Sequence, residues 1–142
     1  MEIPKSLSSL FTKVHFETYP KILIPQSFED TRGSISNIAD GKLGDVAVIT
    51  SKNTSIRANH IHENDWHLSY LVTGQMKYFW DDGLGVNEVL VDAGEMFYTP
   101  PKTPHKMEFL KDSIFIAVSY LSRSQEKYDE DTRKLPLDYF KK

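Results

Sequence analysis

Four of the five histidines of this 142-residue chain lie in two short segments whose residue types suit metal binding or proton transfer. His60, His62 and His67 lie close together, and His105 follows a later stretch that contains three prolines. A neutral imidazole binds first-row transition metals well, and its ordinary pKa suits acid and base chemistry near neutral pH. The spacing therefore predicts a two-part site, if the fold brings the two segments together.

The composition excludes several other kinds of site. The chain has no cysteine, which rules out disulfides, thiolate nucleophiles and zinc–thiolate sites, so any metal must bind to His, Asp or Glu. Its 17 basic and 20 acidic residues are intermixed and give a net charge of -3, so no basic face predicts nucleic acid or a membrane surface as a partner. No run approaches the ~18 apolar residues of a membrane span, and we expect a cytoplasmic protein of one domain.

Short runs rich in β-branched and aromatic residues, separated by turn-forming residues, predict a succession of strands without helical segments between them. These runs are 35–38, 45–50, 56–62, 67–73, 75–80, 86–91, 96–99, 106–109 and 114–121. The glycine-rich connection at 81–85 predicts an antiparallel hairpin. Strands of this length and spacing predict an all-β sandwich or barrel.

Strand geometry predicts which of the candidate side chains meet. Alternate residues of a strand share a face, so His60 and His62 point the same way, and His67 can face them from the start of the next strand. The same alternation places Arg57 on the opposite face, unless a β-bulge intervenes.

The chain divides into three parts on this pattern. We expect an N-terminal arm with edge strands at 1–27, including short strands at 14–16 and 22–24, then the barrel at 28–121. A charged segment follows at 122–142, as a solvated tail or a short helix. The apolar residues of the tail would dock it onto the barrel or a partner subunit, and they are Leu135, Leu137, Tyr139 and Phe140.

The histidine-rich stretch resembles the first motif of the cupin family, G-x5-H-x-H-x3-4-E-x6-G. His60 and His62 match its histidine pair, and Gly74 matches its final glycine. Two positions differ, because Thr54 replaces the leading glycine and His67 replaces the glutamate.

The stretch before the fourth histidine resembles the second cupin motif, G-x5-P-x-G-x2-H-x3-N. Gly94, Pro100 and His105 match it, whereas Lys102 replaces its inner glycine and Phe109 its asparagine. Together the two motifs, in the right order, imply a double-stranded β-helix, the cupin jelly-roll barrel, with short N- and C-terminal extensions.

The cupin resemblance implies a metal site inside the barrel. His60, His62, His67 and His105 would bind one divalent transition metal ion, with Fe, Mn, Ni, Cu and Zn not distinguished. The alternative is a set of histidines that hydrogen-bond to one another or to a substrate without a metal. Because His67 replaces a carboxylate, the site would lack one negative charge, which changes the metal that it favours.

A second resemblance concerns function. The pattern F-x-D-x-R-G at 28–33 and the stretch 56–62 resemble cupin-type sugar-nucleotide epimerases and 3,4-ketoisomerases. This resemblance implies that His60 or His62 acts as the base on a carbon beside a carbonyl, although those enzymes generally work without metal. A tyrosine or another histidine would return the proton, and the candidate tyrosines are Tyr98, Tyr70 and Tyr78.

The same resemblance implies a nucleotide-sugar as the small-molecule substrate. Arg32, Arg57 and Lys102 would supply positive charge for its pyrophosphate, and Trp66 would line the cavity. We therefore expect a metal-binding sugar-nucleotide isomerase or epimerase of surface-polysaccharide synthesis, active as a homodimer. One alternative is a metal-dependent dioxygenase or lyase on a small organic acid or diketone, and another is a non-catalytic ligand-binding cupin.

Overall fold

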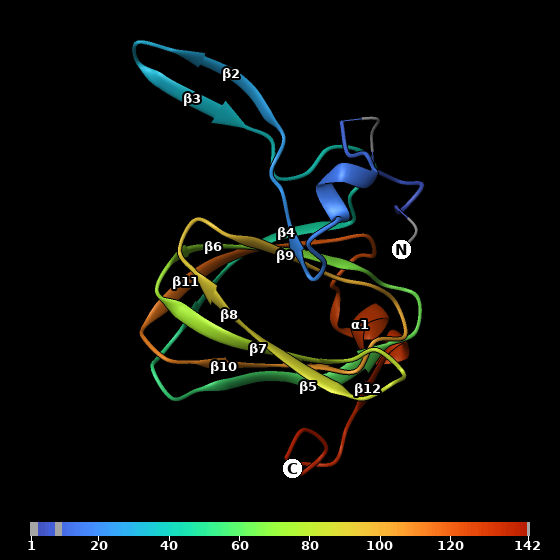
Figure 1. Ribbon diagram of the computed structural model, residues 1–142. Coiled ribbons are helices and arrows are strands. Elements are labelled where there is room, and N and C mark those ends of the chain that lie inside the picture. Colours follow the sequence, from blue (N-terminus) through green and yellow to red (C-terminus); the bar gives the residue numbers. More distant parts are fainter. Residues whose placement is uncertain (1–2, 8–9, 142) are drawn as a thin grey trace.

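A computed structural model describes residues 3–7 and 10–141 and shows two antiparallel five-stranded sheets that face one another (Figure 1). The elements in chain order are η1 (Lys13–Phe16), β1 (Lys21–Ile22), β2 (Gln26–Asp30), β3 (Gly33–Ser36), β4 (Asp45–Ser51), β5 (Ile56–His62), β6 (His67–Thr73), β7 (Gln75–Asp81), β8 (Val86–Asp92), β9 (Met96–Thr99), β10 (His105–Phe109), β11 (Ser113–Ser119), α1 (Gln125–Asp131) and β12 (Thr132–Lys134). The strand order is β1-β9-β6-β11-β4 in one sheet and β12-β5-β10-β7-β8 in the other. This arrangement confirms the jelly roll.

Alternation along the strands decides which side chains fill the interior. In β6, Leu71 packs in the core between the sheets, whereas Leu68 belongs to a second core on the outer face. The expected hairpin is also confirmed, because β7 and β8 pair antiparallel around the turn at 82–85. None of the helices in residues 3–7 and 10–141 is long and apolar enough to cross a membrane.

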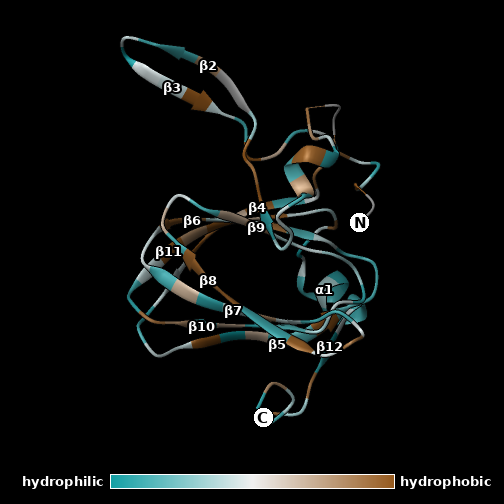
Figure 2. Cartoon of the chain, viewed as in Figure 1, coloured by the Kyte–Doolittle hydropathy of each residue, from teal (hydrophilic) through white to brown (hydrophobic). Residues whose placement is uncertain are grey.

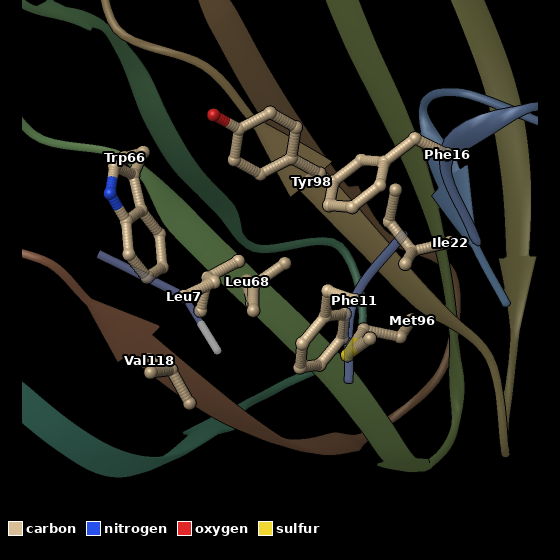
Figure 3. Packing of buried hydrophobic residues seen from close by; sticks show 9 residues of the cluster. All are labelled: Leu7, Phe11, Phe16, Ile22, Trp66, Leu68, Met96, Tyr98 and Val118. Atoms are coloured by element: carbon tan, nitrogen blue, oxygen red, sulfur yellow. The ribbon is translucent and has the colours of Figure 1, made fainter. Parts of the chain in front are cut away.

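The second core lies between the N-terminal segment and the outer face of the first sheet. Leu7, Phe11 and Phe16 are buried there against Met96 and other residues of the sheet (Figure 3). The strand expected at 14–16 is wrong, since these residues lie in the 3-10 helix η1. This helix lets Phe16 reach the sheet.

The hairpin of β2 and β3 stands apart from both sheets (Figure 1). Figure 2 shows hydrophobic residues on it, although it is held away from the jelly roll. Phe28 and Ile35 are cross-strand partners in it, and their side chains are 49% and 59% exposed. The expected barrel boundary at residue 28 therefore differs from the structure, where this hairpin precedes β4.

The C-terminal segment joins the second sheet. β12 pairs with β5, so that Thr132 lies opposite His62, and α1 lies at one end of the space between the sheets (Figure 1). Further on, Phe140 is buried and packs on Phe79. The segment expected as a charged tail or a short helix thus forms a short helix and an edge strand beside the histidines.

Candidate functional site

Three strands, two from one sheet and one from the facing sheet, bring the four predicted histidines together. His60 and His62 come from β5, His67 begins β6, and His105 begins β10, where it is the cross-strand partner of His60. The ring centroid of His60 lies 4.3 Å from that of His62 and 4.7 Å from that of His105. The ring centroids of His62 and His67 lie 4.6 Å apart. All four side chains are buried.

The hydrogen bonds of the imidazoles show which nitrogens remain available. Nδ1 of His105 lies 2.8 Å from the carbonyl oxygen of Thr103. Because a carbonyl only accepts, Nδ1 must carry the proton, and Nε2 carries a lone pair. Nδ1 of His62 lies 3.0 Å from Oγ1 of Thr132, so this ring is also held by its Nδ1.

These rings fit a divalent metal ion. Nε2 of His62 and Nε2 of His105 are buried without a hydrogen-bonding partner among the described residues. Potential ligand atoms of His60, His62 and His105 lie within 4.8 Å of one another. Neutral imidazoles that are oriented through Nδ1 and present Nε2 are typical metal ligands.

Burial keeps these imidazoles neutral. Desolvation lowers the pKa of His62 to about 4 and that of His105 to about 3, and the neighbouring histidines add to the effect in both. It lowers the pKa of His60 further, with repulsion from His105 as the next cause. These three imidazoles therefore have the protonation state that metal binding requires at neutral pH.

His67 is held differently from the other three. Its Nε2 lies 2.8 Å from Oδ2 of Asp65, a buried carboxylate that also accepts from the backbone N–H of Leu121. Burial alone would raise the pKa of Asp65, but the hydrogen bond from His67 holds it below its usual range. Asp65 thus brings a carboxylate to the cluster, although the motif has lost its glutamate at position 67. Nothing in the sequence marks Asp65 as part of the site, apart from its place two residues before His67.

Arg57 reaches the histidine side of β5 through a β-bulge. Ala58 and Asn59 both have positive φ, 65° and 56°, and the pairing with β10 shifts there, from His60 opposite His105 to Ala58 opposite Lys106. The extra residue reverses the alternation, so Arg57 lines the same cavity as His60. This bulge is the exception that the sequence analysis allowed for.

A cavity of about 110 Å³ lies beside the histidines. Arg123 and Tyr128 of the C-terminal segment close one side of it. The hydroxyl of Tyr128 lies 3.3 Å from Nδ1 of His60. Sequence reasoning missed both residues because they lie in a charged stretch without apolar periodicity, and nothing in that stretch marks them.

Two predicted aromatic residues lie on the outer face of the first sheet, away from the histidines. Tyr98 packs edge-on against Phe16, with centroids 5.5 Å apart (Figure 3). Trp66 stacks on Tyr120. The structure therefore does not bring Tyr98 to the cluster as a proton donor, or Trp66 to the cavity. Tyr70 also packs in this outer core.

Tyr78 is the one of the three candidate tyrosines whose ring faces the interior. It lies 6.4 Å from His105 between centroids, and its hydroxyl is 2.8 Å from Oγ1 of Thr99. Burial raises its pKa beyond that of an ordinary tyrosine. This hydroxyl is engaged with Thr99 and does not ionise readily.

The predicted cations Arg32 and Lys102 lie outside the cavity. Arg32 lies in the turn of the projecting hairpin, where its exposed side chain pairs with Asp30 at 2.6 Å. Lys102 is exposed and pairs with Glu63 at 3.7 Å. Of the three predicted cations, the structure brings only Arg57 to the histidines.

Comparison with known proteins agrees with this geometry. Residues 47–119 match the cupin domain family, a range that contains both motifs. None of the curated proteins compared with the chain matches it.

The fold is similar to several solved structures. The chain aligns with CapF, a capsular polysaccharide assembling protein of Staphylococcus aureus, at a TM-score of 0.60 and 22% identity, covering 82% of this chain and 35% of CapF. It therefore spans about a third of the length of CapF. The QdtA 3,4-ketoisomerase of Thermoanaerobacterium thermosaccharolyticum, in complex with TDP, gives a TM-score of 0.65 and 16% identity over 87% of this chain and 93% of QdtA. ChmJ, a 3'-monoepimerase of Streptomyces bikiniensis in complex with dTDP-quinovose, gives a TM-score of 0.66 and 15% identity over 83% and 68% of the two chains.

These identities bear on the fold alone, whereas the domain match covers half of this sequence and includes every histidine of the cluster. The chain therefore belongs to the cupin family.

Proposed function

We propose that this cupin is a metal-binding isomerase or epimerase that moves a proton on a carbon next to a carbonyl of a nucleotide-linked sugar, in the synthesis of a surface polysaccharide. The observation that carries the proposal is the buried histidine cluster, in which one imidazole is paired with a carboxylate beside three others whose ligand atoms converge. The fold likeness to QdtA and ChmJ supports the choice of substrate.

His67 is the best placed base. In the neutral ring that donates Nε2–H to the Asp65 carboxylate, the lone pair would lie on Nδ1, which is the atom that would accept a proton from the substrate carbon. Asp65 would then stabilise the imidazolium that forms. This assignment moves the base from His60 or His62, which the family resemblance implied, to His67.

His60, His62 and His105 would hold the metal. A divalent ion bound there would polarise the carbonyl oxygen and stabilise negative charge on it. Tyr128 and Thr132 orient His60 and His62, and Thr103 orients His105. Burial of the cluster excludes bulk water from the reacting carbon.

The test of this proposal is exchange of carbon-bound protons. The protein would be incubated in deuterated water with a dTDP-linked 4-keto-6-deoxy sugar, and deuterium would be followed by NMR and mass spectrometry. We expect exchange beside the carbonyl, and its loss in His67→Asn. His15→Asn is the matched control, because His15 lies in η1 outside the cluster. Absence of exchange in the metal-loaded wild type would refute the proposal.

The size of the cavity favours a second candidate. At about 110 Å³ this cavity has room for about four water molecules at ~30 Å³ each, much less than a nucleotide-linked sugar requires, whereas a separate pocket of about 770 Å³ is also lined by His60 and Tyr128. A lyase or dioxygenase acting on a small organic acid or diketone would fit without displacing α1. Turnover of such an acid, with or without oxygen uptake, would distinguish this candidate from the first.

A further inference from the structure

The four arginines of the chain fall into two pairs with different surroundings. Arg32 and Arg133 are on the surface and paired with Asp30 and Glu63. None of the ion pairs among the described residues involves Arg57 or Arg123. Both of these unpaired arginines line the cavity beside the histidines.

Arg57 is fixed in position by its own chain. Its Nε donates to Oγ of Ser51 at 2.7 Å, and its Nη2 donates to the carbonyl oxygen of Thr50 at 2.8 Å. Both acceptors are uncharged, so the guanidinium keeps its full positive charge. The bulge at Ala58 and Asn59 turns this held side chain toward the cavity. A bulge next to a functional site commonly has this effect.

Arg123 approaches from the C-terminal segment. Its Cζ lies 5.3 Å from the ring centroid of Tyr128, which is a stacking contact and not an ion pair. Its positive charge acts on the cluster. The pKa of His60 is lowered mainly by desolvation, next by the neighbouring histidines, and also by Arg123. The two arginines therefore place two permanent positive charges around one small space.

The rest of the cavity wall contains nothing that neutralises these charges. Of the described residues that line it, none is acidic. The apolar lining residues are Ile49, Ala58, Met107, Phe115 and Ala117. Apolar walls strengthen the attraction between a guanidinium and an oxyanion by limiting the competition from water, although Arg57 itself is exposed and Arg123 is half-buried.

We propose that the cavity binds an anionic oxygen group of the substrate, a carboxylate or a phosphoryl group, through Arg57 and Arg123. The inference rests on the proposed function for the reaction at the cluster, and it identifies the part of the substrate that the cavity holds. The volume restricts this part to a small unit. A phosphoryl group would come from a nucleotide-linked sugar, and a carboxylate from a small organic acid.

The experiment measures anion binding to the metal-loaded protein by calorimetry, with dTDP, inorganic phosphate and malonate as probes. We expect at least one probe to bind, with an affinity that falls as salt is raised. Arg57→Gln and Arg123→Gln should each weaken binding by about 10-fold to 100-fold, as expected for a charge-assisted hydrogen bond. Arg133→Gln is the matched control, because it removes a surface arginine, and it should leave the affinity unchanged.

The metal content and circular dichroism of each variant show whether the fold is retained, and Arg57→Lys and Arg123→Lys provide variants that keep the charge. Binding of dTDP and phosphate would assign the site to a phosphoryl group, and binding of malonate alone would assign it to a carboxylate. The proposal is overturned if no probe binds, or if both Gln variants bind as the wild type does.

This outcome is separable from that of the proposed function. Arginine-dependent malonate binding without deuterium exchange into sugars would refute the isomerase and leave the anion site intact. Normal deuterium exchange with an unchanged KM in both Gln variants would support the isomerase and refute the anion site.

Discussion

Thr54 and Lys102 stand where the two cupin motifs have glycine, and both have a positive φ, 73° and 60°. Gly74 and Gly94, the glycines that the chain retains, have φ values of 99° and 88°. The motif glycines thus mark a backbone conformation, which this chain keeps even where the residue has changed. A β-branched threonine in the left-handed region is strained.

Replacing Thr54 by glycine should relieve this strain. The left-handed region costs a residue with a Cβ about 1–2 kcal/mol, and the greater freedom of glycine in the unfolded chain offsets part of this gain. We expect Thr54→Gly to raise the free energy of unfolding by up to about 1 kcal/mol, measured by urea denaturation. Thr50→Gly, in an extended strand, should lower it. Destabilisation by Thr54→Gly would contradict this account.

The histidines make a second prediction at this scale, on metal binding. We expect the protein to retain about one equivalent of a divalent transition metal. His62→Ala and His105→Ala should each lower the metal content at least tenfold, because each removes a buried Nε2 that has no other partner. His15→Ala should retain the metal. Elemental analysis and the shift of Tm on metal addition would measure this, and a wild type indifferent to Mn, Fe, Ni, Cu and Zn would contradict it.

At the scale of elements, the position of β5 explains much of the site. It lies between β10, which carries His105, and β12, which carries Thr132. The sequence predicted the strands of the histidines because their alternation and turns are local signals. It did not predict α1 and β12 as parts of the site. Polar side chains hold these two elements against β5 and the loop that follows it, so their sequence shows no periodic pattern of apolar residues.

Asp131 is the polar residue on which this attachment most depends. Its carboxylate accepts from the backbone N–H groups of Asn64 and Asp65, at 2.8 and 2.9 Å, and from Nδ2 of Asn64. Asp131→Ala would leave these donors without their partner, at a cost of about 1–3 kcal/mol for the N–H of the buried Asp65 and less for the donors of the exposed Asn64. We expect a lower Tm and faster amide exchange at 63–65. Asp129→Ala, at an exposed position of the same helix, should change neither, and equal effects of the two variants would argue against this role.

At the scale of the whole molecule, the jelly roll was predictable from strand spacing and motifs. The packing of the N-terminal segment on the outer face of the first sheet was not predictable. Leu7 and Phe11 come from a segment without a strand or helix pattern, so they reach Leu68 and Met96 only through tertiary packing. The β2–β3 hairpin stands apart from both sheets, and no local signal in the sequence shows where it lies.

The exposed residues of the molecule predict a homodimer. Phe28 and Ile35 on the hairpin are 49% and 59% exposed, and Val46 and Val48 on the outer face of β4 are 59% and 71% exposed. We expect the hairpin of one copy to cover Val46 and Val48 of another copy, since burying apolar surface stabilises association by about 25 cal/mol per Å². Light scattering after gel filtration should show a dimer.

The double variant Phe28→Ser, Ile35→Ser should shift the protein toward the monomer. Leu84→Ser is the control, because Leu84 is 97% exposed in the turn between β7 and β8 and lies on neither surface. A dimer equally stable in both variants would exclude the hairpin as its contact.

The late position of α1 and β12 in the chain has a consequence for synthesis on the ribosome. The strands that carry all four histidines emerge before Tyr128 and Thr132 do. Until then His60 and His62 lack the hydroxyls that orient them, and the loop at 63–65 lacks Asp131. A nascent chain thus presents loosely held imidazoles, and we expect the proposed metal ion to bind selectively only after the last strand has docked.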